Sequence, residues 1–181
     1  MTRVRSLLVI LGLAAALGLA QPVVSTGGVL DGAGFVVGQA VAPGSVVSIF
    51  GTGLATSLLQ GDTIPLSTRI GNTSVTFNGI SAPLYFVSGG QVNAQLPWDV
   101  LPQGTTTGTA NVVVTVNGVA SAPKQVPVST FSPNMFAIAG PGFAIAINPD
   151  GSLAAPAGSI PGFPTRPAKA GEALILLANG L

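Results

Sequence analysis

Short runs of alternating apolar and polar residues, separated by turn-forming residues, recur along most of the chain. In the clearest run, residues 91–96, Val92, Ala94 and Leu96 would lie on one face of a strand and amide side chains on the other. Beyond residue 20, no segment keeps the apolar period of a helix. The pattern predicts an all-β fold, with strands near residues 45–50, 69–77, 80–87, 91–96, 110–116 and 119–128 and a Gly/Thr-rich loop at residues 103–109.

Two Asn-Gly dipeptides, at residues 78–79 and 117–118, predict β-hairpins. Each follows a β-rich run, and Asn-Gly supplies the two positive-φ positions that a type I′ turn requires. A two-residue hairpin would pair apolar residues across each turn: Phe77 with Ile80, and Val116 with Val119. Turn chemistry and apolar pattern agree, which favours both hairpins.

Residues 1–20 have the pattern of a cleaved secretory signal peptide. Arg3 and Arg5 form a positive n-region, and residues 6–19 form an apolar stretch that is too short to span a bilayer comfortably. Residues 18–20 then place small side chains before Gln21, as a cleavage site requires. We therefore expect a secreted or cell-surface protein with no membrane span after cleavage.

The mature chain divides into four expected parts. Residues 21–28 form an N-terminal tail, and residues 29–128 form an immunoglobulin-like sandwich, which has about 100 residues and seven strands in its common form. Residues 129–167 form a β-hairpin extension, with a turn at residues 148–151, and a proline-rich linker. Residues 168–181 form the first strand of a second β domain.

An internal repeat supports this second domain. Residues 44–54 and 171–181 each contain a glycine, a short apolar strand and a closing Gly-Leu pair. The second copy stops at Leu181, so we interpret residues 168–181 as part of a truncated second β unit. The alternative is that they supply a last strand to the first sandwich.

Charge is unusually sparse in this chain. Only 6% of residues are charged, against about a quarter in ordinary soluble domains. The mature part has four basic and five acidic residues, a formal charge of −1, with no basic cluster for nucleic acid or anionic membrane. With no cysteine, the fold depends on packing and strand pairing rather than disulfides.

The side chains of common active sites are missing. There is no histidine and no cysteine, and the five acids are widely separated. The glycines at residues 51–53 follow a strand but lack the third glycine, the helix and the acidic residue of a dinucleotide site. Asn148 and Asp150 fit a turn better than a calcium loop. We predict no enzyme activity and no catalytic, cofactor-binding or metal-binding residue.

Two aromatic residues, Trp98 and Tyr85, are the candidate ligand-stacking residues. An exposed aromatic ring can stack on a sugar, and the amide face of residues 91–95 could bind hydroxyl groups. The alternative is that Trp98, beside Pro97, fills the core or an edge of the sandwich.

Several segments resemble the IPT/TIG family of immunoglobulin-like domains. They are residues 41–54, the run from Val75 to Gly79 with Ala82, the step at Pro97, and residues 112–118. The chain is also similar to the Solibacter-type uncharacterised C-terminal domain of secreted bacterial proteins, at residues 42–51, 85–88 and 91–98 and at Asn148 with residues 150–153. This resemblance covers roughly residues 29–181 and implies an extracellular β module without catalytic residues.

We therefore expect a non-catalytic secreted module for protein–protein contact or spacing, with other extracellular proteins or glycans as partners. The alternative is a carbohydrate-binding accessory module.

Overall fold

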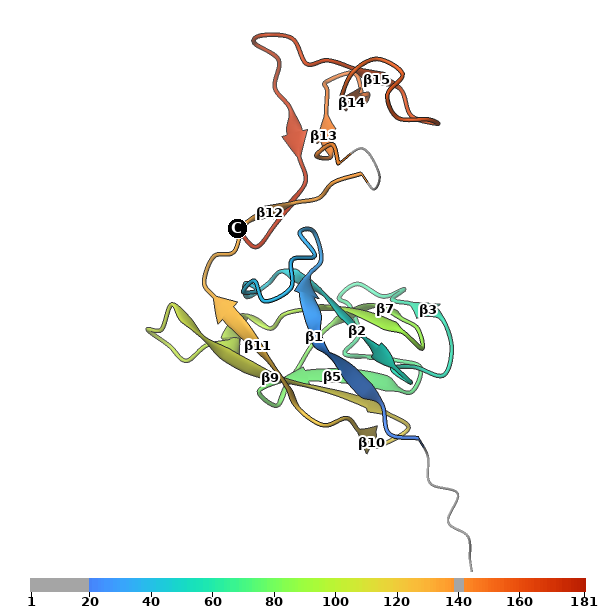
Figure 1. Cartoon of the computed structure of the whole chain (residues 1–181), viewed down its shortest axis with the longest axis vertical. Helices are drawn as coiled ribbons and strands as arrows, with labels where there is room; N and C mark the ends of the chain where they lie inside the picture. The colour runs from blue at the N-terminus through green and yellow to red at the C-terminus, as the bar shows by residue number, and fades with distance from the viewer. Residues whose placement is uncertain (1–19, 139–141) are drawn as a thin grey trace, which may run out of the picture.

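The computed structural model describes residues 20–138 and 142–181 (Figure 1). The predicted signal sequence, except its last residue, lies outside these residues. The described chain forms a β-sandwich, from which a smaller β extension projects, and the C-terminus lies where the two parts meet (Figure 1). None of its helices is long and apolar enough to cross a membrane.

The sandwich consists of two mainly antiparallel sheets. The first has the order β1–β2–β8–β7–β3, with β1 (Val23–Asp31), β2 (Val46–Thr52), β8 (Gln91–Gln95), β7 (Leu84–Val87) and β3 (Leu59–Gln60). The second sheet has the order β10–β9–β5–β4, with β10 (Val119–Ala120), β9 (Thr107–Val116), β5 (Thr73–Phe77) and β4 (Arg69–Ile70). Two further strands join it: β11 (Lys124–Ser129) pairs with β9, and β6 (Ile80–Ser81) pairs with β5.

One hydrophobic core lies between these sheets. Phe77 is its largest fully buried side chain, and Val92, Ala94 and Leu96 are fully buried, as the alternation of residues 91–96 predicted. Both Asn-Gly hairpins are confirmed, because Phe77 pairs with Ile80 and Val116 with Val119 and all four turn residues have positive φ. The all-β, immunoglobulin-like fold expected from the sequence is therefore observed.

The predicted N-terminal tail is wrong for residues 23–28. They belong to β1, where Val24 is buried and lies opposite Gly51 of β2. The ladder is interrupted between Val24 and Val29. The serine, threonine and two glycines at residues 25–28 break the alternation of apolar and polar side chains, so the sequence pattern did not predict this strand.

Other boundaries also differ from the predicted ones. Residues 107–109 lie in β9 rather than in a loop, because they pair with the end of β11. The strand predicted at 69–77 is divided by Gly71, whose φ is +55°. The strand predicted at 80–87 is divided near Pro83, where the chain passes from the second sheet (β6) to the first (β7).

The extension has two small sheets and a long connection. Its strands are β12 (Asn134–Met135), β13 (Ala146–Ile147), β14 (Leu153–Ala154), β15 (Thr165–Arg166), β16 (Ile175–Leu176) and β17 (Ala178–Asn179). The first sheet has the order β15–β14–β13–β16, and β12 pairs with β17. The strands within residues 168–181, β16 and β17, therefore pair with β13 and β12 and join neither sheet of the sandwich. The stretch predicted as a linker contains β14 and β15.

Candidate functional site

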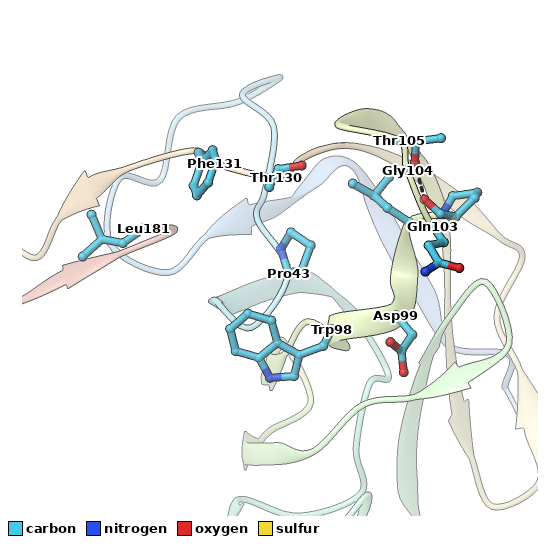
Figure 2. A pocket seen from close by; sticks show the side chains of 11 residues that line it. Pro43, Trp98, Asp99, Gln103, Gly104, Thr105, Thr130, Phe131 and Leu181 are labelled. Carbon is cyan, nitrogen blue, oxygen red and sulfur yellow. Dashed lines mark hydrogen bonds between the residues drawn. The ribbon is translucent and has the colours of Figure 1, made fainter.

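A groove of about 690 Å³ lies at the end of the sandwich, beside the extension. Its walls come from four parts of the chain that are far apart in sequence (Figure 2). They are the turn before β2, the connection from β8 to β9, the segment after β11, and the C-terminal residue. The groove is lined by the side chains of Pro43, Trp98, Asp99, Gln103, Phe131 and Leu181, among others.

The path of the backbone after β8 places Trp98 at the surface. Leu96 and Pro97 are buried, and the chain then enters the short 3₁₀ helix η1 (Trp98–Val100). Val100 points into the core and is 3% exposed, whereas Trp98 is 70% exposed. The alternative that Trp98 fills the core is therefore wrong.

Gly44 forms the support of the indole ring. A Cβ atom at Gly44 would collide with the six-membered ring of Trp98, so the ring rests directly on the glycine backbone. Gly44 also has a φ of +78°, which only glycine adopts without strain. Its N–H donates to the carbonyl oxygen of Leu96 at 2.8 Å, which joins the turn to the end of β8. The indole is thus fixed on one side and open on the other.

The opposite wall is apolar, and the rim is polar. Phe131 and Leu181 are 67% and 77% exposed, and in Figure 2 they lie across Pro43 from Asp99 and Gln103. An open aromatic ring beside hydrogen-bonding groups suits a flat, partly apolar ligand such as a sugar ring or a peptide. Within the described residues, no group of three or more acidic side chains could hold a metal ion.

Tyr85 does not belong to this groove. It lies on β7 at an irregularity in the pairing with β8 and is 36% exposed. The amide face of β8 is also separate, and its side chains bond to each other. The Oδ1 atom of Asn93 accepts from Ser48 and Gln91, and Gln95 donates to the Gly44 carbonyl oxygen. The structure therefore does not bring Tyr85 to Trp98, and of these amides only Gln95 reaches the Gly44 turn on which the indole rests.

A buried side chain, Asn179, joins the extension to the sandwich. Its Nδ2 atom donates to Asp31 Oδ2 at 2.6 Å and to the Val46 carbonyl oxygen at 2.8 Å. Its Oδ1 atom accepts from the Val46 N–H at 2.9 Å. Asp31 is itself 1% exposed, and its other oxygen accepts from the N–H groups of residues 33 and 34. Asn179 thus satisfies polar groups that the sandwich alone would leave unpaired.

The connection between β15 and β16 is held by an ion-pair cluster. Arg166 donates to Asp150 at 2.6 Å and, through two nitrogens, to both oxygens of Glu172 at 2.8 and 3.0 Å. Hydrogen bonds from the Ser152 hydroxyl and from Arg166 hold the pKa of Asp150 well below its usual value. Hydrogen bonds from Arg166 and from the Lys169 N–H lower the pKa of Glu172. These charges are engaged with each other and lie outside the groove.

Sequence reasoning missed Phe131 and Leu181 as partners of Trp98, and it missed the Asn179–Asp31 contact. The nearest of these is 33 residues from its partner in the chain, so only the folded arrangement brings them together. A single acid at the end of an apolar strand, Asp31, was the one available signal that a buried polar contact exists there.

Two facing sheets with a shared core define an immunoglobulin-like β-sandwich. The IPT/TIG domain family matches residues 37–130, which is more than half of the chain, and the chain belongs to this family. IPT/TIG domains are non-enzymatic modules that typically serve protein interaction or spacing. A comparison with curated proteins gives no match.

Proposed function

We propose that this chain is a secreted, non-catalytic module for protein contact or spacing. The observation that carries the proposal is the buried contact of Asn179 with Asp31 and Val46, which couples the sandwich to the extension. A spacer needs a fixed orientation between successive units, and buried hydrogen bonds with defined geometry supply it. The resemblance of residues 91–98 to the Solibacter-type domain supports an extracellular setting.

The coupling is tested by comparing the tumbling of the two parts. In the native chain, ¹⁵N relaxation is expected to give one rotational correlation time for the sandwich and the extension. Asn179→Ala leaves Asp31 Oδ2 and the Val46 N–H without these partners, so the two times should separate. Thr52→Ala is the matched control, because Thr52 occupies the same place in the first copy of the repeat and is exposed. Independent tumbling in the native chain would contradict a spacing role.

Export is tested by the N-terminus of the mature protein. Expression with residues 1–20 in a bacterial host should release a chain that begins at Gln21 outside the cytoplasm. Replacing Arg3 and Arg5 by glutamate should keep the precursor inside the cell, because the n-region must be positive. A native chain that is retained with its first residues intact would overturn the proposal of export.

Carbohydrate binding is the second candidate, and the exposed, supported indole of Trp98 favours it. Titration with soluble oligosaccharides should change the fluorescence of this residue, which is the sole tryptophan in the sequence. Trp98→Ala should abolish binding measured by calorimetry, whereas Tyr85→Ala, which alters an aromatic outside the groove, should leave it unchanged. Equal loss in both variants, or no binding by the native chain to a glycan array, would reject this candidate.

A further inference from the structure

The chain contains three Asn-Gly dipeptides, at residues 78–79, 117–118 and 179–180. In such a pair the glycine backbone nitrogen can attack the Cγ atom of the asparagine, because glycine has no side chain to obstruct the approach. A bond forms between that nitrogen and Cγ, the Cγ–Nδ2 bond breaks, and the amide leaves as ammonia with the proton of the glycine N–H. Water then opens the five-membered imide at either carbonyl carbon, which gives aspartate or isoaspartate. Each dipeptide is therefore a candidate site of covalent modification.

The first two dipeptides lie in turns of the same geometry. Asn78 and Asn117 both have a φ of +51°, and the glycine after each has a φ of +81°. All four residues are exposed. Each asparagine N–H donates to a neighbouring carbonyl oxygen, that of Asn78 to Asn111 at 2.9 Å and that of Asn117 to Asn72 at 3.1 Å. Backbone conformation and access of water therefore do not distinguish the two turns.

The side chains of the two asparagines differ in their hydrogen bonds. The Oδ1 atom of Asn78 accepts from the Asn111 N–H at 2.8 Å, and its Nδ2 atom donates to the Val100 carbonyl oxygen at 3.2 Å. Within the part of the chain that the structure describes, the Asn117 side chain makes no hydrogen bond. Asn78 must break its bonds before Cγ can approach the next nitrogen, whereas the side chain of Asn117 can rotate without losing any.

The third dipeptide is the most protected. Asn179 is 7% exposed, and its side chain makes three hydrogen bonds, one to Asp31 and two to the backbone of Val46. The reaction there requires the contact between the sandwich and the extension to open locally, because both the ring closure and the entry of water need space. Protection of the asparagine side chain therefore increases from Asn117 to Asn78 to Asn179.

We propose that Asn117 is a modification site, at which the chain reacts with itself and with water to give aspartate and isoaspartate, ahead of Asn78 and Asn179. The reaction adds one negative charge to residues 21–181, whose formal charge is −1. The new charge lies beside β10, at the end of the sandwich remote from the extension (Figure 1). The inference is independent of the proposed function, because neither the Trp98 groove nor the Asn179 contact takes part in it.

Isoaspartate also changes the length of the turn. Its additional methylene group lies in the main chain, so a two-residue loop that contains it no longer fits the type I′ geometry. β10 is only two residues long, and it pairs with β9 through Val119 and Ala120. We therefore expect isoaspartate at position 117 to open this short hairpin, and aspartate at the same position to leave it paired.

The test measures the conversion of each asparagine in the native full chain. The protein is incubated in mildly alkaline buffer, because the attacking nitrogen must lose its proton, and samples are then cut with chymotrypsin. Cleavage after aromatic and leucine residues places the three asparagines in separate peptides for mass spectrometry. Asn117 should convert at least about tenfold faster than Asn78, whose two bonds must break first, and Asn179 should be the slowest. Isoaspartate should accompany aspartate, since direct hydrolysis of the amide gives aspartate alone.

The denatured chain is the control, and it requires no variant. In guanidinium chloride the side-chain bonds and the burial are lost, so the three rates should agree within about threefold. Equal rates at Asn117 and Asn78 in the native chain would overturn the inference, as would an Asn117 that reacts only after denaturation. The same tenfold ratio in the denatured chain would also overturn it, because the fold would then not be the cause.

The opening of the hairpin is tested against Asn117→Asp, which has the new charge without the additional methylene group. Amide exchange at Val119 should be about tenfold faster in the isoaspartate form than in the native chain. In Asn117→Asp it should stay within about twofold of the native rate. Equal exchange in the isoaspartate form and in Asn117→Asp would contradict the expected effect on the turn. Asn179 keeps its amide in these samples, so the tumbling test of Asn179→Ala is unaffected.

Discussion

The strand pair β1–β2 of the sandwich recurs in the extension with the same register. Val24 and Val29 lie opposite Gly51 and Ile49 in the sandwich. Met135 and Ala146 lie opposite Ala178 and Leu176, which occupy the positions of Gly51 and Ile49 in the repeat of residues 44–54 at 171–181. In this copy, β12 and β13 therefore correspond to β1, and β16 and β17 correspond to β2.

The two copies differ in burial. Val47 and Ile49 of β2 are 0% exposed, whereas the corresponding Leu174 and Leu176 are 37% and 53% exposed. The copy is the more hydrophobic of the two strands, so its exposure does not follow from its composition. β2 is covered because β8 pairs with its other edge and the second sheet lies over its inner face. A local pattern therefore defines a strand, and the neighbouring strands decide whether it becomes core.

The polar groups at the ends of the two first strands show the same contrast. Asp31 is the last residue of β1, and its two oxygens accept three hydrogen bonds, one of them from Asn179. Asn148 occupies the corresponding place after β13 and is 2% exposed. Its Oδ1 atom has no partner among the described residues, although its Nδ2 atom donates to Ser152 and to the Arg166 carbonyl oxygen. The buried carboxylate at the end of β1 is therefore fully paired, with the help of the extension, whereas the Asn148 side chain after β13 is paired only in part among the described residues.

The largest expected difference comes from shortening the apolar side chain at one corresponding position in the two copies, Ile49 in β2 and Leu176 in β16. Ile49→Ala should lower the free energy of unfolding of the sandwich by about 2–5 kcal/mol, because it leaves a cavity in the core. Leu176→Ala removes a half-exposed side chain and should change the stability of the extension by about 0.5 kcal/mol or less. Urea denaturation followed by Trp98 fluorescence measures the first change, and amide exchange at Ile147 measures the second. Similar losses in both variants would show that the two strands have equivalent environments.

A smaller effect is expected at the glycine that precedes each strand. Gly44 and Gly171 have φ values of +78° and +85°, so alanine at either position costs about 1–2 kcal/mol in backbone strain. Only at Gly44 would the added Cβ also meet Trp98, since nothing lies within 4 Å at Gly171. Gly44→Ala should therefore destabilise its unit by about 1–3 kcal/mol more than Gly171→Ala does.

Tryptophan fluorescence provides an independent check of this difference. Gly44→Ala should shift the emission of Trp98, because the ring must leave its present support, and Gly171→Ala should leave it unchanged. An unshifted spectrum in Gly44→Ala would mean that the indole is not fixed on this glycine.

The smallest expected effect is a pH dependence confined to the extension. The folded pKa values of Asp150 and Glu172 lie below their unfolded values. The stabilisation by these carboxylates is therefore present above the unfolded values, near pH 4, and is lost as the pH falls through the folded ones. Amides of residues 150–172 should lose exchange protection before those of the sandwich as the pH is lowered from 7 to 3. Arg166→Gln should already lack that protection at pH 7, and simultaneous loss in both parts would contradict a local origin.

Features that depend on residues close together in the sequence could be predicted from it. Both hairpins followed from Asn-Gly turns, and the buried face of β8 followed from its alternation. β1 was missed because the polar residues 25–28 interrupt its ladder. The groove was predicted only in part, since Trp98 could be proposed as a stacking residue but Phe131 and Leu181 could not be placed beside it.

The sequence by itself determined the all-β class, the turns and the likeness between residues 44–54 and 171–181, because turn geometry and side-chain alternation act over a few residues. The tertiary structure decided which of the two similar strands is buried. It also brought Asn179 to Asp31 and left Trp98 open beside Phe131. Those outcomes depend on contacts between residues tens to more than a hundred positions apart, which alternation and turn chemistry do not encode.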